Sequence, residues 1–84
     1  MHYEVILPKK VQKELNKIDV RFQEKIIEAL TVLGAKPKLG KRLAGEYKQL
    51  YSLRVWPFRI IYSIDHGKLI VLVIKIGHRQ GVYK

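Results

Sequence analysis

Cysteine is absent from the chain, and so are long apolar runs. Without cysteine there are no disulfide bonds and no thiolate metal sites, which fits the reducing conditions of a cytoplasm. The longest apolar run, residues 69–74, lies between two lysines and is far too short to span a membrane. The N-terminal residues also lack the basic and then apolar order of a signal peptide. We therefore expect a cytoplasmic protein that requires no membrane, metal or other cofactor.

Acidic residues are scarce, which leaves a strong positive charge. The 84 residues include 17 Lys and Arg but only seven Asp and Glu, and the formal net charge is +10. The excess is uneven: residues 34–84 hold eleven cations and two acids, whereas residues 1–33 hold six cations and five acids. A chain of this length is expected to form one small domain, residues 1–84. Its charge indicates a polyanionic partner, an acidic protein partner, or both.

Hydrophobic spacing in the N-terminal half predicts one strand followed by two helices. Residues 3–7 form a short strand that ends at Pro8, a residue that also suits the first turn of a helix. Asp19 is the expected N-cap of the second helix, and Gly34 is its expected end. The apolar stripes of the two helices are Val11, Leu15, Ile18, Phe22, Ile26, Leu30 and Leu33.

Three further strands are predicted after a basic loop over residues 34–46. They span residues 50–55, 58–65 and 68–76. His66-Gly67 suits a tight hairpin turn because glycine accepts positive φ, whereas Trp56-Pro57 requires a wider loop or a cis bond. The predicted fold is α+β in the order βααβββ, with a helical hairpin packed on one face of a twisted antiparallel sheet.

Alternation along these strands divides their side chains between two faces. The face richer in aromatic and large apolar residues, such as Tyr62, is expected to pack against the helices. The opposite face carries two arginines and an aliphatic patch. Either the patch is a partner site, or the basic loop or the C-terminal tail covers it. The patch consists of Ile61, Ile70 and Leu72.

Arg54 and Arg59 are equidistant from the Trp56-Pro57 turn, so they are predicted to face each other across a hairpin. Like charges directly opposite each other on a sheet repel. The arrangement therefore indicates a site for an anion, and we expect the phosphate of RNA or DNA to be that anion.

Two segments resemble a known family. Residues 43–65, LAGEYKQLYSLRVWPFRIIYSID, contain a Leu-x-Gly, a Tyr-x-Leu-Arg strand and an Arg-Ile-Ile-Tyr strand. Residues 71–84, VLVIKIGHRQGVYK, contain Gly-His-Arg-x-x-Val-Tyr. In order and spacing these motifs resemble the RelE/ParE superfamily of type II toxin–antitoxin toxins, on the RelE side. The resemblance, including the helical hairpin, covers essentially the whole chain.

The resemblance implies an enzyme that acts on RNA. RelE-type toxins are ribosome-dependent endoribonucleases that cut mRNA in the ribosomal A site and stop translation. By resemblance, Arg59 contacts the scissile phosphate, Arg54 is a second basic residue, Arg79 is the tail arginine and Tyr83 is the catalytic tyrosine. Ser52 is a departure, because some family members carry a further cation at this position. Lys48 or the Lys41-Arg42 pair is the expected substitute.

This chemistry requires no metal. RNA cleavage needs a base for the 2′-hydroxyl proton, an acid for the leaving 5′-oxygen, and positive charge on the phosphate. Arg54 and Arg59 supply the charge, and Tyr83 is the candidate base because nearby cations favour its ionised form. Arg79 is placed to stabilise the leaving oxygen. His78 is the better acid by its ordinary pKa, or else a structural residue of the tail.

Several partners follow from the resemblance. The ribosome and mRNA are expected partners, as is an acidic antitoxin segment that folds on binding and uses the aliphatic patch. The residues expected to bind RNA or the ribosome are Lys41, Arg42, Lys48 and Trp56. Solvated surface charge is the alternative for the lysines, and a packed or antitoxin-contacting turn residue is the alternative for the tryptophan.

Two other functions remain open at this point. One is a ParE-like toxin that binds DNA gyrase without enzymatic activity, which the serine at position 52 allows. The other is an inactive module that binds RNA or the ribosome. The basic pair on the predicted hairpin and the tail motif favour the nuclease.

Overall fold

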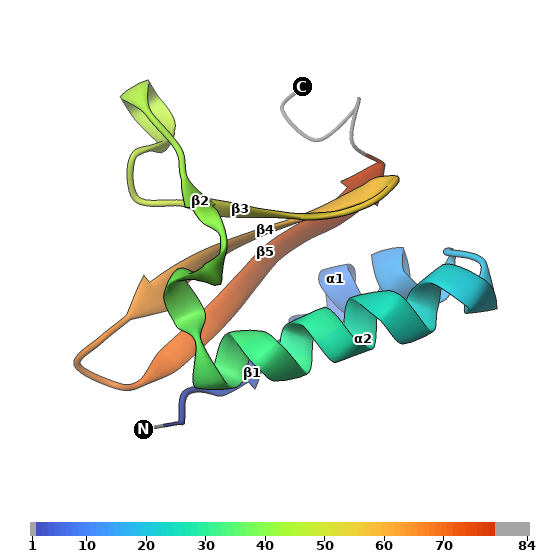
Figure 1. Ribbon diagram of the computed structural model, residues 1–84, viewed down its shortest axis with the longest axis horizontal. Coiled ribbons are helices and arrows are strands. Elements are labelled where there is room, and N and C mark those ends of the chain that lie inside the picture. The colour runs from blue at the N-terminus through green and yellow to red at the C-terminus, as the bar shows by residue number, and fades with distance from the viewer. Residues whose placement is uncertain (1, 79–84) are drawn as a thin grey trace.

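The computed structural model describes residues 2–78 as two helices on one face of a five-stranded sheet (Figure 1). Within this part of the chain, neither helix combines the length and the apolar character that a membrane crossing requires. The elements are β1 (Glu4–Ile6), α1 (Lys9–Asn16), α2 (Val20–Ala35), the 3-10 turn η1 (Pro37–Leu39), β2 (Lys41–Arg42), the 3-10 turn η2 (Gly45–Tyr47), β3 (Tyr51–Val55), β4 (Phe58–Asp65) and β5 (Ile70–His78).

The strands lie in the order β1-β5-β4-β3-β2. The predicted α+β arrangement is confirmed, but the sheet is mixed rather than wholly antiparallel. The neighbouring strands from β5 to β2 are antiparallel, whereas β1 runs parallel to β5 and places Glu4 opposite Ile70. A parallel pair needs a long connection between its two strands, and here that connection comprises all the intervening elements.

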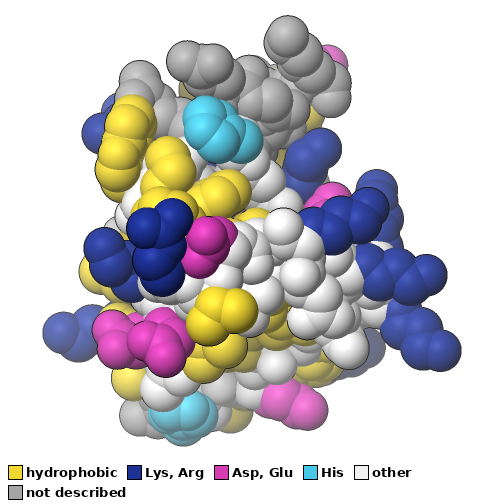
Figure 2. All heavy atoms as spheres, turned by 90° about the vertical axis from the view of Figure 1, so that its right-hand side faces the viewer, with side chains coloured by type: hydrophobic (Ala, Val, Ile, Leu, Met, Phe, Trp, Pro, Cys, Tyr) yellow, Lys and Arg dark blue, Asp and Glu magenta, His cyan; other side chains and the backbone are white. Residues whose placement is uncertain are grey.

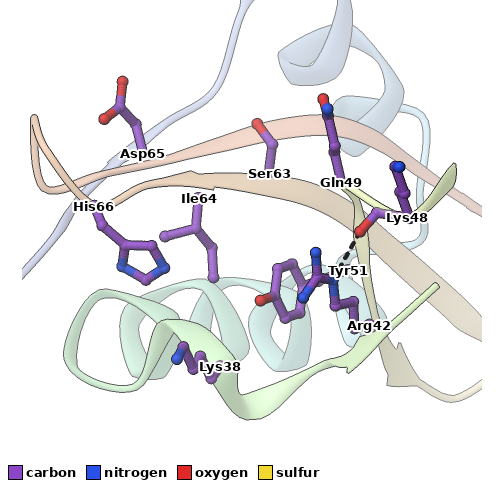
Figure 3. Close-up of a pocket in the computed structure, with 9 residues that line it drawn as sticks. All are labelled: Lys38, Arg42, Lys48, Gln49, Tyr51, Ser63, Ile64, Asp65 and His66. Carbon is purple, nitrogen blue, oxygen red and sulfur yellow. Dashed lines mark hydrogen bonds between the residues drawn. The ribbon is translucent and has the colours of Figure 1, made fainter. Parts of the chain in front are cut away.

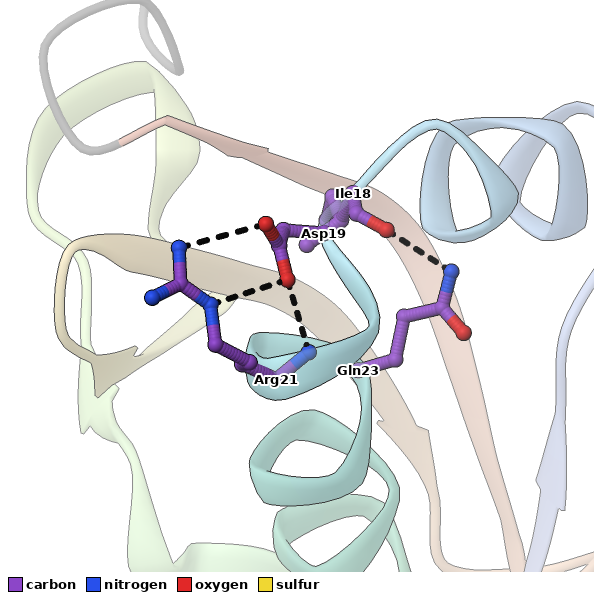
Figure 4. Close-up of polar contacts among 4 residues, drawn as sticks. All are labelled: Ile18, Asp19, Arg21 and Gln23. Atoms are coloured by element: carbon purple, nitrogen blue, oxygen red, sulfur yellow. Dashed lines mark hydrogen bonds and ion pairs between the residues drawn. The ribbon is translucent and has the colours of Figure 1, made fainter.

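Asp19 is the N-cap of α2, as predicted. Its side chain accepts a hydrogen bond from Arg21 N at 2.9 Å and forms an ion pair with the Arg21 guanidinium at 3.2 Å (Figure 4). Gln23 Nε2 donates to the carbonyl oxygens of Ile18, at 2.8 Å, and Leu15, at 3.1 Å. These bonds satisfy backbone groups that the ends of two helices leave unpaired. They hold α1 and α2 in the predicted tight hairpin.

Gly34 has a different role from the one predicted. The helix continues through Gly34 to Ala35, so the prediction that this glycine ends it is wrong. A Cβ atom at Gly34 would lie 2.8 Å from His2 Nε2 and 3.0 Å from Tyr3 O. Tyr3 N donates to Gly34 O at 2.7 Å. The glycine therefore allows the chain before β1 to approach the helix closely.

The turn between β4 and β5 is longer than predicted. Asp65 pairs with Ile70, so four residues connect the two strands. The residue with positive φ is Leu69, at 56°, and not Gly67. The Asp65 side chain stabilises this turn, because its Oδ1 accepts a hydrogen bond from Lys68 N at 3.0 Å. The prediction of a two-residue turn is therefore wrong.

A β-bulge in β5 changes which of its side chains face the helices. Tyr62 of β4 lies opposite Val73, whereas the preceding residue of β4 lies opposite Lys75. Ile74 is thus an extra residue, and its side chain is exposed. Strict alternation from Val73 would direct Lys75 toward the helices. The bulge instead directs Ile76, which is 2% exposed, into the core.

The basic loop over residues 34–46 contains structure that the sequence does not indicate. Lys41 and Arg42 form β2, which pairs with β3 so that they lie opposite Ser52 and Tyr51, respectively. A strand of two residues shows no measurable alternation. The expectation of an irregular loop is therefore wrong in this part of the chain.

The core lies between the helices and one face of the sheet, as alternation predicts. The cluster of buried residues is Val11, Ile26, Leu30, Leu33, Ile60, Tyr62, Val71, Val73 and Ile76.

Tyr62 connects this core to the basic loop. Its side chain is fully buried. Its hydroxyl donates a hydrogen bond to Pro37 O at 2.7 Å and accepts one from Gly40 N at 2.8 Å. A Cβ atom at Gly40 would lie 2.6 Å from this hydroxyl, so only glycine fits there without displacement. One side chain of β4 thus fixes both ends of η1 and the start of β2.

We expect Tyr62→Phe to lower the free energy of unfolding by about 1–3 kcal/mol, because it leaves the N–H of Gly40 and the carbonyl of Pro37 without their partner. Urea unfolding measures this loss. Tyr51→Phe is the matched control, because the Tyr51 ring stacks on Tyr62 with a centroid distance of 5.4 Å, and its half-buried hydroxyl has no comparable pair of hydrogen bonds to residues 2–78. An equal loss in both variants would contradict the role of the Tyr62 hydroxyl.

The stability that Tyr62 provides should depend on pH. Burial raises the pKa of Tyr62 above its ordinary value of 10.0, against a smaller opposing effect of the hydrogen bond from Gly40. The folded state therefore holds the phenolic proton more tightly than the unfolded chain does. This contribution is fully present below pH 10 and is lost as pH rises through the folded pKa. We expect the free energy of unfolding of the wild type to exceed that of Tyr62→Phe at pH 8, and this difference to become smaller above pH 10. Urea unfolding between pH 8 and 11 measures it, and a difference that stays constant would contradict the expectation.

Candidate functional site

The two arginines of the β3–β4 hairpin face each other as predicted. Arg54 lies directly opposite Arg59. The connection between the strands contains a cis peptide bond between Trp56 and Pro57, one of the two predicted alternatives. Cross-strand partners point to the same face of a sheet, so both guanidinium groups belong to the face opposite the helices. This is the geometry that predicts an anion site.

Ser52 holds Arg59 in place. Nη1 of Arg59 donates a hydrogen bond to Ser52 Oγ at 3.0 Å. Ser52 is buried and Arg59 is half-buried, whereas Arg54 is exposed. The serine, which marks a departure from the family pattern, therefore orients the guanidinium that is the candidate phosphate ligand. Arginine has five N–H donors in a rigid fork, a geometry that matches the oxygens of a phosphate.

Lys41 supplies a further cation on the same face. It lies opposite Ser52 in the β2–β3 ladder, so its side chain leaves the sheet on the side of Arg59. Its neighbour Arg42 lies opposite Tyr51 and leaves on the other side. Of the substitutes that the sequence suggests for the missing cation at position 52, Lys41 is the one placed on the arginine face.

His78 does not join the arginines. It lies opposite Phe58, and its ring meets the Phe58 ring edge-on with a centroid distance of 5.8 Å. The Phe58 ring also contacts Phe22 of α2 at 5.5 Å. His78 therefore points to the helix side of the sheet, away from Arg59. The β-bulge explains this direction, because strict alternation from Val73 would place His78 on the arginine face.

The remaining predicted residues fall in three places. Trp56 is 62% exposed at the tip of the hairpin that carries the arginines. Arg42 and Lys48 lie toward the other end of the sheet, where Arg42 Nε donates to Lys48 O at 2.8 Å. Arg79 and Tyr83 lie outside the described residues.

The predicted aliphatic patch is largely covered. Ile61 is only 5% exposed, and Ile70 and Leu72 are half-buried. The most accessible aliphatic residue of β5 is Ile74, which the bulge turns outward and leaves 41% exposed. Sequence alternation alone does not identify it as the bulged residue.

The C-terminal end of β5 is held by α1. Glu14 Oε1 accepts a hydrogen bond from Ile76 N at 3.0 Å. The strand β1 is too short to reach this position, because it pairs only with the first three residues of β5. A carboxylate thus takes the place of a strand neighbour immediately before Gly77 and His78. Lys and Arg side chains project from both flanks of this end of the molecule, with acidic side chains between them (Figure 2).

A second basic region lies at the opposite end of the sheet. It is an open cleft of about 610 Å³ between the basic loop and the end of β4 (Figure 3). Its described lining residues are Lys38, Arg42, Lys48, Gln49, Tyr51, Ser63, Ile64, Asp65 and His66. Sequence reasoning predicts Arg42 and Lys48 as binding residues but misses Lys38 and His66. The contacts that bring them here are long-range ones, such as the Tyr62 hydrogen bonds and the 2.8 Å contact between Tyr3 Oη and His66 Nδ1.

Comparison with known proteins identifies the family. The family model described as the ParE toxin of type II toxin–antitoxin systems, parDE, matches residues 5–83. The chain belongs to this toxin family. The toxin is 28% identical to Toxin RelG of Mycobacterium tuberculosis, over all of its own length and 99% of that protein. It is 30% identical to a putative toxin RelE1 of Methanocaldococcus jannaschii, over all of its own length and 98% of that protein.

Solved structures agree with this assignment. The toxin is similar to a chain of the toxin–antitoxin complex RelBE2 of Mycobacterium tuberculosis, with a TM-score of 0.86, 27% identity and coverage of 94% of the toxin and 100% of that chain. A chain of the archaeal RelE–RelB complex of Pyrococcus horikoshii shares the fold, with a TM-score of 0.81, 24% identity and coverage of 96% and 99%. The resemblance seen in the sequence motifs is therefore confirmed: the chain is a RelE-like toxin of a type II toxin–antitoxin system.

We expect Glu14→Ala to free the end of β5. The variant leaves the amide of Ile76 without its carboxylate acceptor, so hydrogen exchange at Ile76 should be faster and the free energy of unfolding lower by about 1–3 kcal/mol. Glu14→Gln keeps an acceptor oxygen and is the matched control, with a smaller effect on both measurements. Unchanged exchange at Ile76 in Glu14→Ala would show that the carboxylate does not hold the strand.

Proposed function

We propose that this toxin is a ribosome-dependent endoribonuclease that cleaves mRNA in the A site and thereby inhibits translation. The observation that supports the proposal most directly is the facing pair of Arg54 and Arg59, with Arg59 oriented by Ser52 and Lys41 on the same face. Three cations gathered on one face of a small sheet form a site for a phosphodiester. The relatives named RelE and RelG support the same assignment.

The proposed reaction is an attack within the RNA. The 2′-oxygen attacks the neighbouring phosphorus, its proton passes to a base, and the bond from phosphorus to the 5′-oxygen breaks as that oxygen accepts a proton. Arg54 and Arg59 stabilise the charge that develops on the phosphate oxygens. Tyr83 is the proposed base and Arg79 the proposed partner of the leaving oxygen, both by resemblance to the family. His78 is not assigned as the acid, because its ring packs on Phe58 on the other face.

A ParE-like action on DNA gyrase is the second candidate, because the matching family model describes toxins of parDE systems. The two candidates share one fold, so only the target separates them. The facing arginines favour the nuclease, because two opposed guanidinium groups repel each other and a bound phosphate offsets this repulsion.

We further propose that an acidic antitoxin segment neutralises the toxin. The net charge of +10 favours an acidic partner, and similar chains have been solved in toxin–antitoxin complexes. The proposed apolar contacts are Ile61, Ile70 and Leu72. Because Ile61 is already buried, Ile70 and Leu72 offer the accessible surface.

Cleavage of mRNA in a purified translation system, with and without ribosomes, tests the proposed activity. We expect cleavage only with ribosomes, and a decrease of about 10²–10³-fold in Arg59→Ala, because one ligand of the developing charge is lost. Arg79→Ala and Tyr83→Phe should also lose activity. Ser52→Ala should retain the fold and lose less activity than Arg59→Ala, since it disturbs the orientation of the guanidinium but not its charge.

Full cleavage by Arg59→Ala would overturn the phosphate-site assignment. A folded toxin that stops growth without cleaving mRNA would instead indicate gyrase, which a supercoiling assay then tests directly. A folded chain with neither effect would indicate an inactive RNA-binding module.

A further inference from the structure

The cleft at the end of the sheet opposite the arginine pair brings three cations together without an ion-pair partner. Lys38, Arg42 and Lys48 line it, and none of them forms an ion pair with an acidic residue in the described part of the chain. Asp65 is the acidic residue among the described lining residues, and its Oδ1 is engaged by Lys68 N in the turn. Positive charges that line one cleft repel one another, and an anion bound there reduces this repulsion.

The cleft is also held in a fixed shape. The carbonyl oxygen of Lys48 accepts from Arg42 Nε, which orients the guanidinium and leaves its two Nη groups for a ligand. The loop segment that carries Lys38 is fixed on both sides by the buried hydroxyl of Tyr62, through Pro37 O and Gly40 N. A loop held in one position loses less conformational entropy on binding than a mobile loop does.

The polar neighbours of these cations suit a nucleotide. Gln49 and Ser63 offer hydrogen-bonding groups, and the rings of Tyr51 and His66 are part of the lining (Figure 3). A volume of about 610 Å³ is large enough for a nucleotide with its phosphate. Single-stranded RNA is commonly bound by cations on the backbone and aromatic rings near the bases.

The cleft and the arginine pair lie at opposite ends of the sheet. Arg42 lies opposite Tyr51 and leaves the sheet on the helix side, whereas Arg54 and Arg59 belong to the other face. The strand between the two sites is the edge strand β2. An RNA strand that contacts both sites therefore passes around this edge of the sheet.

We infer that the cleft lined by Lys38, Arg42 and Lys48 is a second phosphate site, which binds the RNA backbone at a place separate from the phosphate at Arg54 and Arg59. The choice of RNA rests on the proposed function, whereas the existence of an anion site rests on the geometry of the cleft alone. The site extends the contact with RNA beyond the reacting nucleotides, and it acts in binding rather than in the chemical step.

The test measures the affinity of the purified chain for a fluorescent eight-nucleotide 2′-O-methyl RNA at several salt concentrations. This RNA lacks the attacking 2′-hydroxyl, so the result does not depend on cleavage. We expect the triple variant Lys38→Ala, Arg42→Ala, Lys48→Ala to bind more weakly and to reduce the slope of log K against log salt by about 2, because three cations no longer release counterions. The matched control removes the same charge from α1, as Lys9→Ala, Lys10→Ala, Lys13→Ala, and should leave the slope nearly unchanged.

A charge-conserving variant makes the test sharper. Arg42→Lys keeps the positive charge but loses the planar fork, so it should bind the RNA about fivefold more weakly with the same salt slope. General attraction between a basic protein and RNA would not produce this result. Thermal unfolding of every variant checks that the exposed substitutions leave the fold intact.

Two outcomes would overturn the inference. Equal losses in the cleft and α1 variants would show that the toxin attracts RNA through its net charge alone. Unchanged binding in both the triple variant and Arg42→Lys would show that the cleft holds no phosphate. A DNA strand of the same sequence separates the two parts of the claim: equal binding of both strands keeps the phosphate site but removes the preference for RNA. Failure of mRNA cleavage in the translation system would remove the proposed activity and leave this measurement intact.

Discussion

The hydrogen bonds of the buried Tyr62 hydroxyl fix the basic loop to the sheet and so determine where the cations of β2 lie. Tyr62 belongs to the central strand β4, and it fixes the loop at Pro37 and Gly40. The next residue after Gly40 begins β2, so the register of this short strand against β3 follows from the same anchor. This register places the side chain of Lys41 on the arginine face and that of Arg42 in the cleft. A single neutral hydroxyl in the core thus determines the positions of several charged side chains on the surface.

The elements with strong periodicity could be predicted from the sequence, whereas those that depend on distant contacts could not. The helical hairpin, the cap at Asp19 and the three long strands follow from local spacing and turn chemistry. The strand β2 forms because it pairs with β3. Gly34 is needed because the chain before β1 lies close to the helix there. The residue with positive φ in the turn between β4 and β5 is Leu69, although glycine is the residue expected to adopt such a backbone conformation. No local pattern encodes these features, because their causes are tertiary.

The same division applies to the site. Symmetry about the Trp56-Pro57 turn is enough to place Arg54 opposite Arg59, because register in a hairpin follows from its turn. In the sequence, Ser52 stands where some family members carry a cation. Only the structure shows that its hydroxyl accepts the hydrogen bond that orients Arg59. The direction of His78 depends on one extra residue in β5, and a bulge leaves no recognisable signature in a continuous apolar run. The residue types of the site were therefore predictable, and their directions only in part.

The parallel pairing of β1 with β5 has a consequence for how the toxin is made. Glu4 to Ile6 are synthesised well before their partners Ile70 to Leu72. A nascent chain can form the helical hairpin early, but its first strand has no neighbour until β5 has left the ribosome. Contacts so distant in sequence also slow folding, because a long loop must close before they contribute. Completion of the sheet, and with it the support of β4 beneath the arginine pair, therefore follows the synthesis of β5.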